Sequence, residues 1–292
     1  MNRYFLFSIS IIITLSFAFQ SSELSKTKSA LLWEVKSKDG KNTSYLFGTF
    51  HVIQKEYFLF NKTLSSKIIN SDTIIMELEK LPTPEESTSL FKLSKGSFFD
   101  YFSPTQNDSI IRWVNDNLHM ESQVFRLYFH QMKPFVFNQL IIQKMFEGKT
   151  ESYELKLFEI AKEKGIPILG LETLEFQLSF FDRLTNEEQN EMVMSNIRNY
   201  VSLKQELVSF QQVYYSQNID SVYQLIQQDK QFRVKHEDEF ITKRNKNWIP
   251  LIENYINKSD CFIAVGAGHL GGENGIINLL EKKGYTLTPI RI

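Results

Sequence analysis

The chain has 292 residues, of which 42% are hydrophobic and 23% charged, so its composition is that of a globular protein. Its 33 basic and 34 acidic side chains give a formal net charge of −1, which lacks the basic excess expected of a nucleic-acid-binding protein. The single cysteine, Cys261, excludes an intramolecular disulfide framework and a zinc site built from several thiolates.

The first residues have the pattern of a secretory signal peptide. Arg3 supplies a positive charge before the apolar run 4–17, and the small residues Ser16 and Ala18 fit a signal-peptidase site. We therefore predict that residues 1–18 are a signal peptide and that the protein is exported, to a periplasm or to the outside of the cell. If the segment stays uncleaved, it is the one predicted membrane contact, although its apolar run is shorter than the roughly 20 residues that span a bilayer.

The rest of the chain, 19–292, predicts strands that alternate with helices. Helical periodicity fills the range 84–164, which we interpret as an insertion, and a second long tract, 187–257; Gly165 is a candidate helix C-cap. This order predicts an α/β fold with a mixed, mainly parallel sheet flanked by helices. The expected strands are runs of β-branched, apolar and aromatic residues at 31–35, 44–47, 73–76, 166–169, 261–265 and 285–290.

Four of these strands end in a polar side chain: His51, Glu77, Glu172 and His269. Ligands bind at the carboxyl ends of parallel strands, so we expect these groups to converge at one edge of the sheet. Each histidine stands three residues after a glycine, which we expect to let the backbone turn sharply and aim the imidazole over that edge. Two imidazoles and a carboxylate form a ligand set for a divalent cation that keeps an open position.

Other interpretations of these residues stay open. Glu77 is compatible with a solvated strand end, and Glu172 with capping of the helix that begins near Leu174. The segment 266–271 matches the glycine pattern of dinucleotide-binding proteins. That pattern needs an acidic residue about 20 positions further on, where this chain has Arg291, so a nicotinamide or flavin site is not predicted.

The motifs, in their order along the chain, resemble those of the TraB/GumN family. The resemblance spans almost the whole chain after the signal peptide and rests on the segments 32–35, 44–52, 76–77, 170–173, 244–245, 248–249, 265–272 and 284–285. It implies a sheet built from two related halves, with helices around it. The family includes the TIKI proteins, which resemble metal-dependent peptidases, and it is similar in structure to erythromycin-esterase-like and ChaN-like haem-binding proteins.

The resemblance also implies roles for particular residues. The two Gly-x-x-His motifs and a glutamate are regarded as the active centre of the family, which corresponds here to His51, His269 and Glu77. The supporting positions carried over in the same way are Glu172, Arg244 and Asn245.

The sequence therefore predicts a metal-dependent hydrolase of the peptidase type, with a peptide or protein as substrate. His51 and His269 would hold a divalent manganese, cobalt or zinc ion, and Glu77 would either complete the ligand shell or act as a general base. Arg244 would either pair with Glu172 or bind a carboxylate of the substrate.

Two other functions stay open at this stage. A haem- or metal-binding protein without turnover would use the same histidines, and the aromatic residues Phe125, Tyr128 and Phe129 would line its pocket. A metal-free ester hydrolase would use one histidine as a base that activates water.

Overall fold

The computed structural model describes residues 29–227 and 238–292, so the signal peptide predicted for residues 1–18 lies outside the described residues. The described chain divides into two compact units. We call one the helical unit, which comprises Leu81–Glu147 and Leu174–Leu207. The other is the sheet unit, which comprises the described residues up to Lys80, then Gly148–Thr173 and Val208–Ile292.

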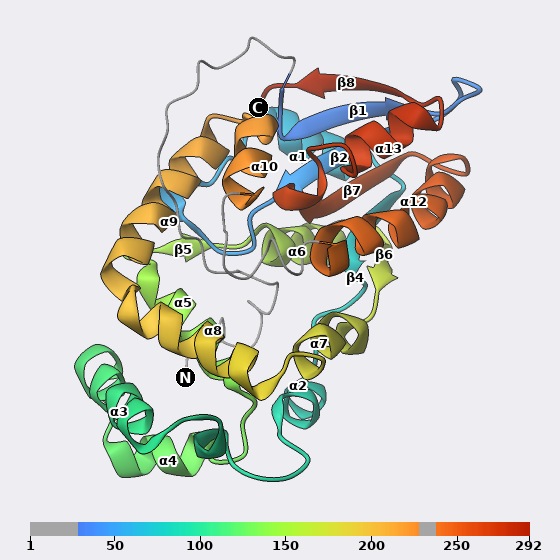
Figure 1. Ribbon diagram of the computed structural model, residues 1–292. Coiled ribbons are helices and arrows are strands. Elements are labelled where there is room, and N and C mark those ends of the chain that lie inside the picture. The colour runs from blue at the N-terminus through green and yellow to red at the C-terminus, as the bar shows by residue number, and fades with distance from the viewer. Residues whose placement is uncertain (1–28, 228–237) are drawn as a thin grey trace. The chain divides into compact units, whose positions relative to one another are not determined.

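The sheet unit is built on six strands, which are β1 (Leu32–Lys36), β2 (Thr43–Thr49), β4 (Thr73–Leu78), β6 (Ile168–Glu172), β7 (Cys261–Gly266) and β8 (Thr286–Ile290). Their order across the sheet is β6-β4-β7-β2-β1-β8 (Figure 1). The neighbours β6, β4, β7 and β2 run parallel, whereas β1 is antiparallel to both β2 and β8. The prediction of an α/β fold with a mixed, mainly parallel sheet is confirmed.

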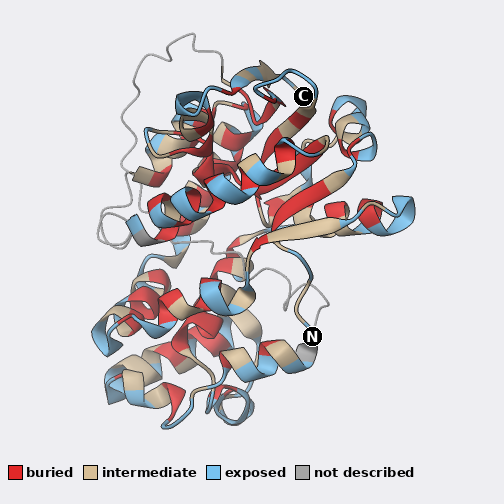
Figure 2. Ribbon diagram, turned by 90° about the vertical axis from the view of Figure 1, so that its right-hand side faces the viewer, coloured by how far each residue is buried: buried red, intermediate tan, exposed pale blue. Residues whose placement is uncertain are grey.

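Helices cover both faces of this sheet (Figure 1). On one face α12 (Lys243–Ile256) contacts α13 (Ile276–Lys282), and behind the sheet in Figure 1 α6 (Tyr153–Lys164) contacts α1 (Lys62–Ile69). Because both faces are covered, the central strand β7 is buried at every position (Figure 2). The unit also contains β3 (Ile53–Gln54), η1 (Lys55–Tyr57), β5 (Thr150–Glu151), α10 (Ile219–Gln227), the π-helical turn η3 (Asp238–Thr242) and η4 (Ala267–His269).

The helical unit contains α2 (Pro84–Phe91), η2 (Phe98–Tyr101), α3 (Pro104–Leu118), α4 (Ser122–Phe129), α5 (Pro134–Met145), α7 (Leu174–Asp182) and α8 (Asn186–Arg198), and α9 (Tyr200–Tyr215) begins in it. In three of these helices the side chain of the N-cap residue accepts a hydrogen bond from the backbone N–H three residues later. The Glu or Gln at that later position accepts a hydrogen bond from the backbone N–H of the N-cap residue. Such reciprocal caps satisfy helix N–H groups that have no partner within the helix. They occur at Thr83, Ser103 and Thr185.

The core of the helical unit is rich in phenylalanine. Phe125 and Phe129 are buried and pack against Phe98 and Phe137, with ring centroids 5.1 to 6.0 Å apart. Tyr128, in contrast, is 63% exposed. The expectation that Phe125, Tyr128 and Phe129 line a haem pocket is therefore wrong: two of the rings fill the core of their own unit, and the third faces solvent.

Two predictions about helix ends have different outcomes in the structure. Gly165 caps α6 in the left-handed region with φ 67°, as predicted. The tract 187–257 is divided into several helices. α8 ends at Arg198, with Asn199 as its C-cap, and Gln217, which follows α9, has a positive φ of 61°. Within the described ranges, no helix combines the length and the apolar character needed to cross a bilayer.

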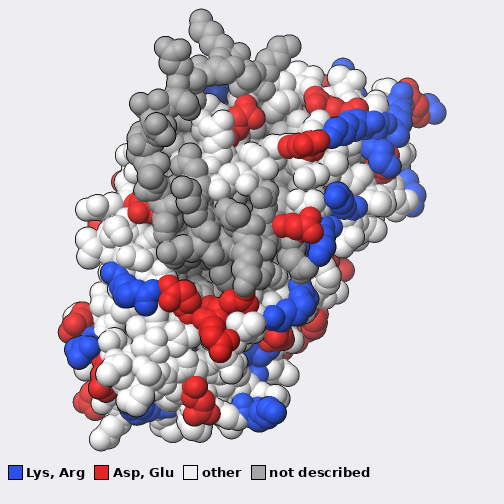
Figure 3. All heavy atoms as spheres, viewed as in Figure 1, with Lys and Arg blue, Asp and Glu red and all other residues white. Residues whose placement is uncertain are grey.

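Charges of both signs are mixed on the surface. On the face shown in Figure 3, the basic side chains lie among acidic ones and form no broad basic area over the described residues. In the sheet unit, for example, Lys38 and Lys283 both pair with Glu253 at 3.1 Å. Exposed pairs of this kind contribute little to stability, typically below about 1 kcal/mol each.

Candidate active site

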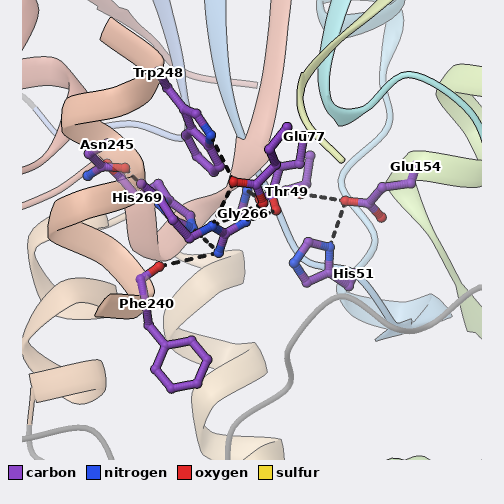
Figure 4. A network of polar contacts seen from close by, with 11 residues as sticks. Thr49, His51, Glu77, Glu154, Phe240, Asn245, Trp248, Gly266 and His269 are labelled. Atoms are coloured by element: carbon purple, nitrogen blue, oxygen red, sulfur yellow. Dashed lines mark hydrogen bonds and ion pairs between the residues drawn. The ribbon is translucent and has the colours of Figure 1, made fainter. Parts of the chain in front are cut away.

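The four side chains predicted at strand ends lie at the same edge of the sheet. Glu77 is near the end of β4, Glu172 is the last residue of β6, and His269 ends the short helix η4 that follows β7. His51 lies just beyond β2. Since β6, β4, β7 and β2 are parallel neighbours, their carboxyl ends bring these groups together (Figure 4).

Three of the groups surround a single point beside Gly266. A Cβ atom on this glycine would lie 3.3 Å from Nε2 of His51, 3.4 Å from Oε1 of Glu77 and 3.6 Å from Cδ2 of His269. We call this position the Gly266 cradle. The three groups can approach one another here because residue 266 carries no side chain that would separate them.

The glycines before the two histidines have a different role from the one we predicted. Gly266 has φ −52°, and Gly48 is not among the residues with positive φ, so neither needs the conformational freedom of glycine. Gly48 instead packs closely, since a Cβ there would lie 3.0 Å from Cα of Ala267. Both glycines are needed for space and not for a sharp turn.

The hydrogen bonds of Asn245 fix the tautomer of His269. Its Nδ2 donates to the carbonyl oxygens of His269 (3.1 Å) and Asn274 (2.7 Å), so its Oδ1 is the acceptor that faces Nδ1 of His269 at 2.7 Å. His269 therefore carries its proton on Nδ1 and has a lone pair on Nε2. That lone pair accepts a hydrogen bond from Nη1 of Arg244 at 3.2 Å.

His51 is held through the same ring nitrogen, but by a carboxylate. Its Nδ1 lies 2.9 Å from Oε1 of Glu154, which also accepts from Oγ1 of Thr49 at 2.7 Å (Figure 4). Burial alone would lower the pKa of His51, but the charge and the hydrogen bond of Glu154, together with the charge of Glu77, outweigh burial and raise this pKa. Burial alone would raise the pKa of Glu154, and its contacts with His51 and Thr49 outweigh that effect and lower it.

Arg244 of α12 ties two of the carboxylates together. Its Nη2 donates to Oε2 of Glu77 and to Oε1 of Glu172, both at 2.6 Å, and its Nε donates to Glu172 at 3.1 Å. Nη1 donates to the carbonyl oxygen of Phe240 and to His269. All five N–H groups of the guanidinium are thus used within the protein, which favours pairing with Glu172 over binding of a substrate carboxylate.

Trp248 completes the environment of Arg244. The guanidinium lies 4.7 Å from the centroid of the indole ring, and the indole Nε1 donates to Oε2 of Glu172 at 3.0 Å. Its bonds to Arg244 and Trp248 make Glu172 a member of the site.

Sequence analysis missed Glu154, Thr49 and Trp248. Glu154 lies 103 residues from its partner His51, and its one local signal is its place in the first turn of α6, which the helix dipole explains without any site. Trp248 stands one helical turn after Arg244, so this spacing could have indicated a shared face of the helix.

A protein-family model also matches this chain. The model of the TraB/PrgY/gumN family matches residues 31–289. The chain belongs to this family. The match includes every residue of the site described above, whereas no curated protein and no solved structure matches this TraB/PrgY/gumN chain.

The described side chains of the site carry an excess of negative charge. Three carboxylates, Glu77, Glu154 and Glu172, stand against the single guanidinium of Arg244, so that two negative charges remain when both imidazoles are neutral. Acidic side chains therefore outnumber basic ones among the groups that the described residues bring to the site.

The charge of Glu77 should make the stability of this protein depend on pH. Burial alone would raise the pKa of Glu77, but Arg244, His269 and His51 outweigh it and lower the pKa from 4.5 to about 2. A pKa lowered by folding stabilises the folded state above the unfolded value and loses that contribution as the pH falls. We expect the metal-free protein to lose about 3 kcal/mol more stability between pH ~5 and pH ~2 than its Glu77→Gln variant does.

Urea denaturation at several pH values measures this difference. Glu159→Gln, on the exposed side of α6, is the matched control and should keep the pH dependence of the unmodified protein. Equal slopes for the unmodified protein and Glu77→Gln would contradict the ionised, buried state of Glu77.

Proposed function

We propose that this TraB/PrgY/gumN family member is a metal-dependent hydrolase of the peptidase type, in which His51, His269 and Glu77 hold a divalent cation. The observation that carries the proposal is the Gly266 cradle, around which one nitrogen, one carboxylate oxygen and a second imidazole ring lie within 3.6 Å. Family membership is compatible with the proposal but does not specify an activity.

The chemistry of the donor groups fits a divalent cation. Both histidines have Nδ1 bonded to an acceptor, Glu154 for His51 and Asn245 for His269, which leaves Nε2 of each ring as the nitrogen that can bind a cation. Nε2 of His51 lies beside the cradle, whereas Nε2 of His269 is bonded to Arg244. Oε1 of Glu77 adds an anionic oxygen.

The arrangement described is not yet that of a bound ion. Within residues 29–227 and 238–292, no group of three His, Cys, Asp or Glu side chains is placed to hold a metal. The distances of 3.3–3.6 Å are measured from a carbon position on Gly266 and are not ligand distances, and Nη1 of Arg244 bonds to Nε2 of His269. A cation bound by Nε2 of His269 would have to replace this contact with Arg244.

The lowered pKa of Glu77 supports one of its two predicted roles. A general base is most effective when its pKa lies near the working pH, and the pKa of about 2 makes Glu77 a weak base at neutral pH. We therefore propose Glu77 as a ligand. A divalent cation held there would polarise a peptide carbonyl and make water more acidic. Manganese, cobalt and zinc all suit this donor set.

The class of substrate follows from the same proposal, whereas the location has a separate basis. A peptide or protein substrate suits an ion that polarises an amide carbonyl. Export, to a periplasm or to the outside of the cell, rests on the pattern of residues 1–18 and is proposed on that ground alone.

A metal-free hydrolase is the second candidate, because His51 and Glu154 have the arrangement of a general base and the group that orients it. In this case Nε2 of His51 would take a proton from water without an ion. Hydrolysis that survives a strong chelator but is lost in His51→Ala would favour it.

Elemental analysis of the purified protein, combined with a peptide-hydrolysis assay, tests the first candidate. We expect about one divalent ion per chain, and loss of both the ion and the hydrolysis in His51→Ala and His269→Ala, because each variant removes an imidazole ligand. His130→Ala changes an exposed histidine outside the site and should keep both. An unchanged metal content in both ligand variants would reject the proposed metal site.

A further inference from the structure

We propose that Glu154 is the positioning residue of His51. Held by Thr49 and Ser152, its carboxylate keeps the proton of His51 on Nδ1 and so presents the Nε2 lone pair to the Gly266 cradle. This inference rests on the proposed function for its purpose. Its first experiment does not depend on metal binding or turnover, so the two can fail separately.

The contacts of Glu154 fix the carboxylate from several sides. Oε1 accepts from Thr49 Oγ1 at 2.7 Å and faces His51 Nδ1 at 2.9 Å, while Oε2 accepts from Ser152 Oγ at 3.1 Å. An ionised carboxylate can only accept, so Nδ1 of His51 must be the donor. The lone pair of the neutral ring is then on Nε2, which is the atom 3.3 Å from the cradle.

Helix α6 explains why a negative charge is stable at this position. Ser152 is the N-cap of the helix and accepts from the backbone N–H of Leu155, and Glu154 lies in the first turn. The N-terminus of a helix carries a partial positive charge that favours a carboxylate. The same backbone therefore fixes the place of the carboxylate and stabilises its charge.

The two histidines are held by different partners. Asn245 offers His269 a neutral amide oxygen, whereas Glu154 offers His51 a full negative charge. A carboxylate behind a ligating imidazole increases the basicity of the ring and strengthens its bond to a cation. His51 should accordingly be the stronger of the two nitrogen donors.

A purely structural role for Glu154 would need only a group of similar size. The side chain is largely buried, with 18% of its surface exposed, so its charge has a desolvation cost that a neutral glutamine would avoid. Glu154→Gln can still accept from His51 and Thr49 through its amide oxygen, but it carries no charge. It therefore separates the position of the group from its charge.

The first experiment is 15N NMR of the imidazole nitrogens in the full, metal-free chain, at a pH where the rings are neutral. We expect the Nδ1–H tautomer for His51 in the unmodified protein and in Glu154→Gln, and a mixture of both tautomers in Glu154→Ala. Glu159→Gln, on the exposed side of α6, is the matched control and should leave the spectrum unchanged. A His51 tautomer that stays the same in a folded Glu154→Ala protein would overturn the positioning role.

The second experiment is a titration of the same proteins with cobalt. We expect Glu154→Ala to weaken binding by about 10- to 100-fold, and Glu154→Gln to weaken it by less because the hydrogen bond is kept. If Glu154→Ala does not fold, the glutamine variant decides the matter, and unchanged cobalt affinity in it would overturn the role of the charge. If the unmodified protein binds no cobalt while the tautomers behave as expected, the positioning role stands and the proposed metal site fails.

Discussion

Replacement of Arg244 by methionine is expected to lower the free energy of unfolding of the metal-free protein by about 3–5 kcal/mol. The guanidinium is bonded to both Glu77 and Glu172 at 2.6 Å, and all three side chains are largely buried. Methionine fills much of the volume but leaves two carboxylates in the interior without their partner. Removing one member of a buried ion cluster costs this much because the remaining charge stays desolvated. Urea denaturation followed by circular dichroism measures the loss.

The control for this prediction is the neighbouring residue. Lys243→Met removes an exposed cation whose ion pair with Asp238 is 3.5 Å long, and it should change stability by less than about 1 kcal/mol. Adding Glu172→Gln to the Arg244 variant should recover part of the loss, since one unpaired charge disappears. Equal stability of Arg244→Met and the unmodified protein would mean that the network contributes nothing to folding.

Gly266→Ala is expected to abolish metal binding and to reduce hydrolysis by at least about 100-fold, although it removes no ligand. The added methyl group would occupy the cradle, 3.3 Å from Nε2 of His51 and 3.4 Å from Oε1 of Glu77. A φ of −52° suits alanine, and the backbone N–H that donates to Glu77 at 2.9 Å is kept. The loss of stability should therefore stay below about 2 kcal/mol. Cobalt titration, the hydrolysis assay and urea denaturation together measure these effects.

A change at the other end of the same strand is the control. Cys261→Ala shortens a buried side chain at the start of β7, away from the cradle, and should leave metal affinity unchanged. Normal cobalt affinity in a folded Gly266→Ala protein would show that the ion does not lie at the cradle, and would redirect attention to other donor groups.

The parts of the site that the sequence predicts are those with a local signal. A short apolar run precedes each of the four residues His51, Glu77, Glu172 and His269. In a parallel sheet the carboxyl ends of the strands lie at one edge, so residues in such positions meet there. The direction of the strands alone places these residues at one edge, so their convergence can be predicted without knowing how distant segments pack.

The parts that the sequence does not predict depend on contacts between distant segments. Glu154 follows no predicted strand end, and nothing near it in the sequence points to His51. Phe125 and Phe129 have the composition expected of either a pocket or a core, and the packing within the helical unit decides for the core. The role of Gly266 was misassigned because the pattern shows a glycine but not whether the fold needs its flexibility or its small size.

The position of β7 has a consequence for the protein during synthesis. This strand lies between β4 and β2 in the sheet, yet it comes after both of them in the chain, at Cys261–Gly266. Until the ribosome has added it, β4 and β2 have no partner on their inner sides, and unpaired strand edges favour aggregation. A nascent chain that stops before residue 261 would lack both β7 and His269, so the middle of the sheet and the site are completed only after this last part of the chain has been added.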